Sequence, residues 1–440
     1  MLRPSKSLIL TQPSRRAPFA DNDAIGARGL RTHQRILDAG LEAFGESGYD
    51  RMTLDRVAEL AGCSRVAIYQ YVSGKDELFR VLAAQAATQM WAALEALDNV
   101  TPDADGHAAL LAYIERLADI ADRYGPIIGA FDAAAEDDES LLDSATSIVH
   151  DGIRRLSARV VGSDLPARLL GPTVELLNTG AVRALCRLSI LRAADPECYG
   201  RGRVALALAD VVHRVLFGLR PGVNDHVPVV SEPPVLRFSS EASAIFERAG
   251  ELEAVAVGSG KRALGSMLGV ANRLIADSGN RGIRIEDIVA AAGVSRGSFY
   301  TYFDGIDDFV RVMGVRAIKA LSEVVSDLPE APTPSALRRW LHRYSDVNLA
   351  GGPLVRVWAE AVEGPLRGDR AAVIDFGRRR FATMLRARAV GDVDVNAGIL
   401  EAMVEVFASV PRTKSECDAV VNLIERGFLA PIEPLPVLKP

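Results

Sequence analysis

The stretch AGCSRVAIYQYVSGKDELF, at residues 61–79, occurs a second time as AGVSRGSFYTYFDGIDDFV at residues 292–310, an offset of 231 positions. Apolar residues at helical spacing precede both copies, from Ile36 in the first and from Met267 in the second, with the same offset and no gap. A chain of 440 residues exceeds one ordinary core. The repeat therefore predicts two related modules.

Composition and charge are those of an ordinary folded protein with locally basic segments. Hydrophobic residues make up 49% of the chain and charged residues 25%, which argues against bulk disorder. The net charge is −6, yet residues 1–75 hold eleven basic and eight acidic side chains. In residues 261–306 the basic residues exceed the acidic ones by six to four. Both copies of the repeat thus lie in sequence that suits a polyanionic partner.

Helical spacing of apolar residues continues after each copy, and the alternation typical of strands between hairpin turns is hard to find. We therefore expect an all-α fold. Prolines predict breaks in the helices at several points. These lie near Pro102, Pro126 and Pro172 in the first half and near Pro332, Pro334, Pro353 and Pro365 in the second.

The repeated stretch itself predicts two short helices joined by a tight turn. Thr53 and Ser64 are hydroxyl residues placed to cap the two helices, and Gly62 stops the first of them. This is a helix-turn-helix, in which one helix braces the backbone and the other enters the major groove. Arg65 at the exposed start of the second helix can form two hydrogen bonds to guanine. A role as a cap alone also explains Thr53, and a core position also explains Tyr69 and Tyr71.

The region LEAFGESGYDRMTLDRVAELAGCSRVAIYQYVSGKDELFRVL resembles the N-terminal DNA-binding region of the TetR family of transcriptional regulators. The resemblance implies a three-helix DNA-binding head on a helical ligand-binding body, a dimeric assembly and repression as the usual action. Val66 departs from the family, which often has glycine there, and a side chain at this position would hinder close approach of the backbone to DNA. The family's phosphate and base contacts carry over to Thr53, Ser64, Arg65, Tyr69, Tyr71 and Lys75.

The second copy resembles the same region less completely. Arg284 stands where the threonine cap is expected, and Ile306 replaces the lysine at the start of the third helix. Three arrangements are open: both heads bind DNA, with Arg284 supplying a replacement charge, only the first head does, or neither does. The DNA-binding residues expected in the second head are Arg284, Ser295, Arg296, Gly297, Tyr300 and Tyr302.

These observations divide the chain into six segments. We expect a flexible basic arm at 1–28, a first DNA-binding head at 29–77, a first effector and dimerisation body at 78–220, a proline-rich linker and lead-in at 221–259, a second, partly degenerate head at 260–308, and a second effector and dimerisation body at 309–432.

Two modules in one chain suggest an intramolecular pseudo-dimer, whose unlike heads would bind an asymmetric operator. A homodimer of the whole chain, with four heads, is the rival arrangement. The family pairs its last two helices in a four-helix interface. The candidate segments here are 165–192 and 202–219 in the first module and 395–410 and 415–428 in the second.

The resemblance also implies a small, mostly apolar effector that releases the operator. Aromatic and apolar residues of the middle helices are candidates to line its pocket, although residues of this kind are more often plain core. The candidates are Tyr113, Leu117, Ile127, Phe131, Trp340, Tyr344, Trp358 and Phe376.

Other classes of function find less support in the sequence. The six histidines are scattered, and HExxH and glycine-rich phosphate loops are missing. The four cysteines lack CxxC spacing, so we expect no metal site, no cofactor and no disulfide framework. The sequence contains no apolar run of membrane-spanning length, so we expect a cytoplasmic protein without membrane contact. A protein-interaction scaffold that has lost DNA binding in one or both heads remains the alternative to a regulator.

Overall fold

The computed structural model describes residues 27–135, 138–192, 195–218, 236–257, 262–278, 283–361, 367–388, 390–408 and 413–429. In these ranges the regular structure consists of helices, and one isolated bridge pairs Val100 with Val160. The predicted all-α fold is confirmed. Residues 1–26 of the predicted arm and 221–235 of the predicted linker lie outside the described residues. None of the described helices is long and apolar enough to cross a membrane.

The described residues belong to two compact units. One unit draws on Met1–Ala87 and Tyr124–Asp137, and the other on Thr88–Arg123 and Asp138–Pro440. The first unit contains the first copy of the repeat. The second unit contains the second copy together with most of both helical bodies.

The first unit is a small helical head. Its helices are α1 (Ala27–Arg51), α2 (Leu54–Ala61), α3 (Arg65–Ile68), the start of α4 (Lys75–Glu95) and the end of α5 (Ala104–Ala135) from residue 124 on. The backbone of α1 leaves helical geometry at Gly48 (φ 71°, ψ 179°), as expected for the residue that ends the apolar repeat. Phe44, Tyr49 and Phe79 pack ring against ring in the core, with Phe79 edge-on to the other two.

The first body of the second unit contains α5 (Ala104–Ala135) up to residue 123, α6 (Glu139–Arg159), α7 (Ala167–Arg192) and α8 (Arg201–Phe217). The bridge between Val100 and Val160 joins the segment before α5 to the end of α6. The Val100 N–H donates to the Arg159 carbonyl at 2.8 Å, and the Val161 N–H donates to the Val100 carbonyl at 2.9 Å.

The prediction of helix breaks at three prolines is wrong. Helix α5 runs through Pro126 and α7 runs through Pro172, and α14 (Pro334–Ala361) continues past Pro353. A proline removes one backbone hydrogen bond from a helix. In a long helix with a buried face, packing on both sides of the proline outweighs that local cost.

The second module begins with α9 (Ser240–Val257) and a head of α10 (Arg262–Ser278), α11 (Ile285–Ala292) and α12 (Arg296–Tyr300). Helix α9 covers part of the predicted lead-in, and it packs on α10 and α13 (Ile306–Ser326). Phe299, Phe303 and Phe309 form an aromatic cluster at the centre of this head. The body continues with α14, α15 (Arg367–Arg386), α16 (Val393–Ala408) and α17 (Lys414–Phe428).

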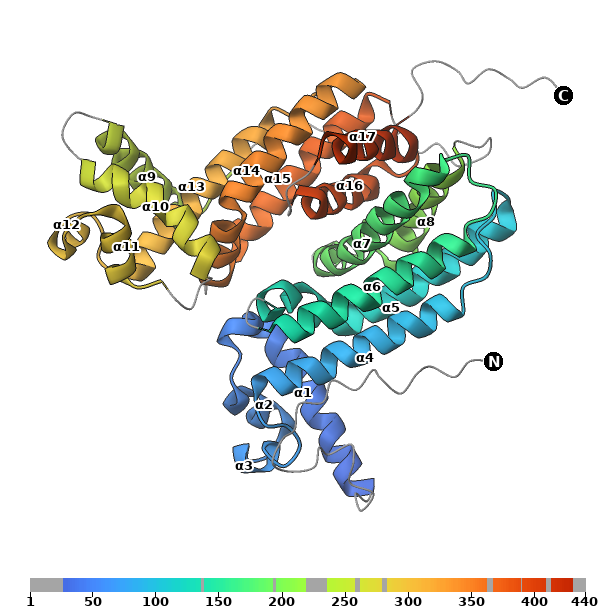
Figure 1. Ribbon diagram of the computed structural model, residues 1–440, viewed down its shortest axis with the longest axis horizontal. Coiled ribbons are helices and arrows are strands. Elements are labelled where there is room, and N and C mark those ends of the chain that lie inside the picture. The colour runs from blue at the N-terminus through green and yellow to red at the C-terminus, as the bar shows by residue number, and fades with distance from the viewer. Residues whose placement is uncertain are drawn as a thin grey trace. The chain divides into compact units, whose positions relative to one another are not determined.

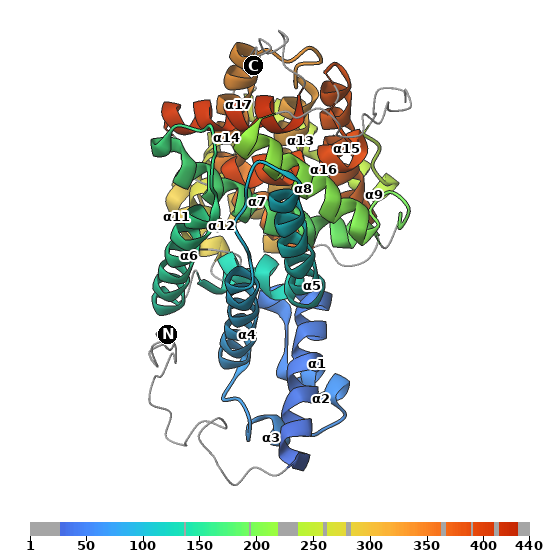
Figure 2. The same cartoon turned by 90° about the vertical axis from the view of Figure 1, so that its right-hand side faces the viewer.

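Helices α7 and α8 of the first module pack against α16 and α17 of the second, and each of the four contacts the other three. Both views show this group within the second unit (Figure 1; Figure 2). Glycines bring the helices close together. A Cβ atom on Gly180 would lie 2.6 Å from Met403, and one on Gly427 would lie 2.7 Å from Val215. The four helices occupy the segments expected to pair the modules.

Two arginines exchange equivalent hydrogen bonds between α8 and α17. The Nε atom of Arg214 donates to the Gly427 carbonyl at 2.8 Å, and the Nε atom of Arg426 donates to the Val215 carbonyl at 2.9 Å. Donor and acceptor are adjacent residues on each helix, so each helix gives the other the same contact. This reciprocity is the pattern of a two-fold interface.

A second set of contacts between the modules is not reciprocal. Arg187 on α7 forms an ion pair with Glu401 on α16 at 3.1 Å and a further one with Glu405. Arg203 on α8 contacts the carboxylate of Asp392 through NH2 at 3.1 Å. At these points the first module supplies the cation and the second the carboxylate, whereas Arg426 of the second module pairs with Asp164 of the first.

Glu401 is the most deeply buried acid of this interface, with 9% of its surface exposed. Burial raises its pKa to about 7, while Arg187 and Arg378 pull it down and Asp375 adds to the rise. Its Oε1 atom lies against the α15 backbone, because a Cβ on Gly377 would be 2.4 Å away. The nearby Tyr344 hydroxyl also has a raised pKa through burial.

We expect Glu401 to make the free energy of unfolding depend on pH. The folded-state pKa of about 7 lies above the ordinary value of 4.5, so the folded chain binds this proton more tightly than the unfolded chain. Stability from this group is therefore full below pH 4.5 and is lost as the pH rises through about 7. The substitution Glu401→Gln should flatten this part of the profile, by about 2 kcal/mol. Urea denaturation of the wild-type chain and the Glu401→Gln variant from pH 5 to pH 8 measures this difference. Parallel profiles of unfolding free energy against pH would contradict the prediction.

Candidate nucleic-acid interface

The helix-turn-helix of the first head is built by caps and one left-handed residue. The Thr53 hydroxyl accepts the backbone N–H of Arg56 at 3.3 Å and so begins α2. Gly62 ends α2 in left-handed geometry, at φ 60° and ψ 42°, which glycine adopts without strain. The Ser64 hydroxyl accepts the backbone N–H of Ala67 at 3.2 Å and begins α3. The chain thus reverses direction within a few residues.

Helix α3 places its first residue in solvent. The Arg65 side chain is 54% exposed and forms an ion pair with Asp55 of α2 at 2.9 Å. Its NH2 group donates to the Tyr69 hydroxyl at 3.3 Å, and Tyr69 is itself 45% exposed. An exposed ion pair of this kind contributes little stability. Its effect is to hold the guanidinium beside the phenol at the tip of the head.

Tyr71 and Lys75 lie closer to the body of the head. The Tyr71 ring stacks on His33 of α1 with centroids 5.9 Å apart, and burial lowers the pKa of His33. Lys75 donates to the Tyr49 carbonyl at 3.1 Å and lies 4.3 Å from the centre of the Tyr49 ring. Their expected phosphate contacts remain predictions.

The second head repeats the arrangement at the same offset. Gly293 ends α11 at φ 66° and ψ 35°, and the Ser295 hydroxyl accepts the Ser298 N–H at 3.1 Å. Arg296 is 62% exposed, pairs with Glu286 of α11 at 2.8 Å and lies 5.8 Å from the Tyr300 ring centre. Asp55 and Glu286 are equivalent positions. The carboxylate that braces the arginine is therefore present in both modules.

The departures of the second head have structural substitutes. Arg284 occupies the cap position, and its backbone N–H and side chain both bond to Asp287, which lowers the pKa of that carboxyl. Ile306 is half-buried against the core of the head. Tyr302 is also half-buried. Gly297 and Tyr300 are exposed, Tyr300 by 50%.

Arg248 of α9 fixes the turn after α12, and sequence reasoning missed it. Its guanidinium forms two bonds to the Asp308 carboxylate, at 2.6 and 2.7 Å, and donates to the Tyr302 carbonyl at 2.9 Å. It has no described counterpart in the first head, because the position 231 residues earlier lies in the range that is not described.

Sequence reasoning also missed exposed residues of the first head. They are Asp55, two positions after the cap of α2, and Gln70, which is exposed like Val66 and Tyr69. The spacing of four residues between Val66 and Gln70 was the signal that could have found Gln70.

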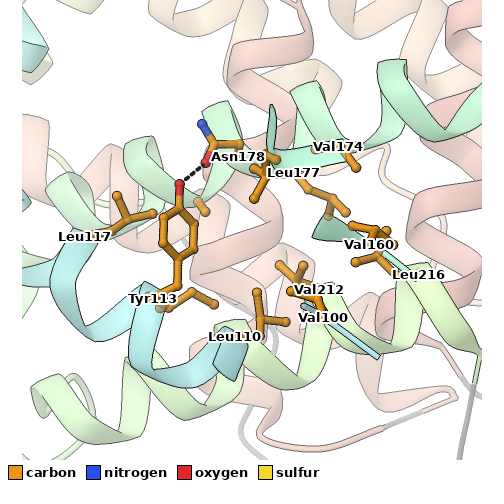
Figure 3. Close-up of a pocket in the computed structure, with 13 residues that line it drawn as sticks. Val100, Leu110, Tyr113, Leu117, Val160, Val174, Leu177, Asn178, Val212 and Leu216 are labelled. Carbon is orange, nitrogen blue, oxygen red and sulfur yellow. Dashed lines mark hydrogen bonds between the residues drawn. The ribbon is translucent and has the colours of Figure 1, made fainter. Parts of the chain in front are cut away.

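A cavity of about 30 Å³ lies in the first body between α5, α6, α7 and α8 (Figure 3). Its walls are aliphatic, and its polar feature is the Tyr113 hydroxyl, which donates to Oδ1 of Asn178 at 2.9 Å. Burial raises the pKa of Tyr113. Of the residues predicted from the sequence to line an effector pocket, Tyr113 and Leu117 line this cavity. Ile127 and Phe131 are not among its lining residues. The space holds a water molecule or two but no larger ligand in this conformation.

The candidates in the second body are packed in its core. The Trp340 indole donates to the Val324 carbonyl at 2.8 Å and stacks on Tyr344 with centroids 5.0 Å apart. Phe376 is 7% exposed. The side chain of Trp358 lies outside the described residues. In the part of the chain that the structure describes, no group of three or more acidic, histidine or cysteine side chains is placed to hold a metal.

Comparison with known proteins matches both heads to one family. The model of bacterial regulatory proteins of the tetR family matches residues 36–82 and 267–313. The HTH-type transcriptional repressor AcnR of Corynebacterium glutamicum is 27% identical over 172 residues, which cover 37% of this chain and 86% of that protein.

Two relatives from Pseudomonas putida are each 41% identical over 58 residues. They are named as an uncharacterized HTH-type transcriptional regulator, TtgW, and the HTH-type transcriptional regulator SrpR. The match covers 13% of this chain and 43% and 27% of those proteins, respectively. A DNA-binding region of the tetR family thus occurs twice in this chain, which makes the chain similar to two regulators of that family in tandem.

Proposed function

We propose that the chain represses transcription by binding an asymmetric operator with two unlike heads carried in one polypeptide. The observation that supports this most strongly is the repeated construction of the recognition turn. In each head a left-handed glycine, a capping serine and a braced arginine present an exposed guanidinium and phenol. Arginine in this position is the commonest reader of guanine in the major groove.

Selection of bound DNA from a random pool, followed by affinity measurement in graded salt, tests the operator proposal. Arg65→Ala should cost about 1–3 kcal/mol on the selected operator and less on random DNA, because a base contact is lost. Arg296→Ala should act on the other half-site. The control is Arg154→Ala, since Arg154 is 73% exposed but lies on α6. Failure to enrich any DNA would support the scaffold alternative, and binding that ignores salt would contradict phosphate contacts.

We propose further that the two modules pair within one chain. The packing of α7 and α8 on α16 and α17 and the reciprocal bonds of Arg214 and Arg426 support this pairing. Covalent linkage makes such pairing independent of protein concentration. The rival is a homodimer with four heads, which would need a second interface.

Light scattering at micromolar concentration decides between the two assemblies. The pseudo-dimer should have the mass of one chain, 47.2 kDa, at every concentration. Arg187→Glu places three acids together at the interface and should lower the midpoint of thermal unfolding without a change in mass. A mass near twice that of the chain would favour the homodimer.

The cavity of the first body is the proposed effector site. Its aliphatic walls and the hydroxyl–amide pair of Tyr113 and Asn178 favour a small, uncharged, mostly apolar compound with one hydrogen-bonding group. A ligand of that kind would have to widen the cavity, and it would release DNA if the widened state fits the operator poorly.

A panel of small neutral aromatic and aliphatic compounds tests this site by thermal shift. We expect a compound that raises the unfolding midpoint also to weaken operator binding. Ala181→Leu should abolish both effects, because Ala181 lines the cavity and is 3% exposed. Tyr113→Phe keeps the shape and should weaken only compounds that bond to the hydroxyl. An unchanged response in Ala181→Leu would place the effector elsewhere.

A further inference from the structure

The recognition turns of the two heads share their charged and phenolic residues but differ beside them. Val66 in the first head corresponds to Gly297 in the second at the offset of 231 residues. The Val66 side chain is 73% exposed, the highest value among the large apolar side chains of the described residues. Gly297 is also exposed. One head therefore presents an apolar branched side chain where the other presents bare backbone.

The fold of the first head does not account for valine at this position. Val66 lies in a helix of four residues whose core contact is Ile68, which is fully buried. A β-branched residue is a poor helix former. Isolated exposed apolar residues are common on proteins. This one, however, directly follows Arg65 and lies three residues before Tyr69, on the outer face of the recognition helix.

The neighbours of Val66 leave its methyl groups accessible. Arg65 is directed to Asp55 and to the Tyr69 hydroxyl, so its guanidinium does not cover the valine. The major groove displays one apolar group, the C5-methyl of thymine. On a helix that enters this groove, the isopropyl group of Val66 is therefore buried favourably when it packs against a thymine methyl.

We propose that Val66 packs against a thymine methyl in the half-site of the first head, and so sets a base preference that the second head, with Gly297, lacks. The inference rests on the proposed DNA-binding function. The proposal also explains the departure from the family at this position. The Val66 side chain keeps the backbone away from the bases, and the same side chain makes the contact with the thymine methyl.

The second head offers the reciprocal variant. A Cβ atom on Gly297 would lie 3.7 Å from the Ser295 hydroxyl, an ordinary contact, with no closer neighbour. Gly297 is not among the glycines with positive φ. Gly297→Val is therefore expected to fold, and it transfers the apolar group to the other half-site.

The test uses the full-length chain and operators taken from the random-pool selection. Each thymine of each half-site is replaced singly by deoxyuridine, which removes the C5-methyl and keeps base pairing. For the wild type, one thymine in one half-site should weaken binding about four-fold when replaced. Val66→Ser should lose this sensitivity; serine and valine have similar helix propensity, so the helix is not loosened. Gly297→Val should gain sensitivity in the other half-site.

The outcomes separate this inference from the function on which it rests. Specific, salt-dependent binding that tolerates deoxyuridine at every thymine would overturn the role of Val66 and leave the regulator intact. Sensitivity that persists in Val66→Ser would also overturn it, by assigning the methyl contact to another residue. Failure to enrich DNA at all would overturn both. Circular dichroism of the variants confirms that each is folded.

Discussion

Each recognition helix depends on the turn that precedes it, because the helix is too short to exist alone. Helices α3 and α12 span four and five residues, far fewer than the roughly 12 an isolated helix needs in water. In each head a glycine in left-handed geometry reverses the chain before the helix, and a serine hydroxyl accepts a backbone N–H of its first turn. One buried side chain then packs the helix on the core: Ile68 in the first head and Phe299 in the second. The position of the exposed arginine follows from these three local features.

The pairing of the modules shows what covalent fusion permits. In a symmetric dimer the same surface patch is used on both sides, so each contact between two different residues occurs twice. Here Arg187 of the first module pairs with Glu401 and Glu405 of the second. Two modules in one chain need only be complementary to each other. The reciprocal bonds of Arg214 and Arg426 retain the symmetric pattern next to contacts that have become specific to each side.

Sequence reasoning predicted features whose cause is local and missed those whose cause is distant. The caps Thr53 and Ser64 and the glycine turn at Gly62 follow from residue types at fixed spacing. The interface ion pair joins residues more than two hundred positions apart, and no local pattern records it. The proline breaks failed because a local rule was applied where packing decides. The aromatic candidates for the effector pocket fall into two groups: Tyr113 lines a cavity, whereas Trp340 packs in the core. Residue type could not separate them, because aromatic residues serve both roles.

The packing of the second head bears on the scaffold alternative. In the first head the aromatic cluster comes from α1 and α4, as Phe44, Tyr49 and Phe79. In the second it comes from α12, α13 and the turn between them, and the equivalents of Phe299, Phe303 and Phe309 in the first head are Ile68, Val72 and Leu78.

Each head therefore builds its core on three aromatic rings, but at different positions of the repeat. Substitutions accumulated without constraint would leave voids or strain, each costing about 1–3 kcal/mol. The second core is instead filled, with all three phenylalanines at 1% exposure or less. Helix α9 adds the Arg248 clamp at the turn after α12. The second head is therefore tightly packed, and its Arg296 is held exposed to solvent by Glu286. This construction is that of a binding surface and favours DNA binding by both heads over binding by the first alone.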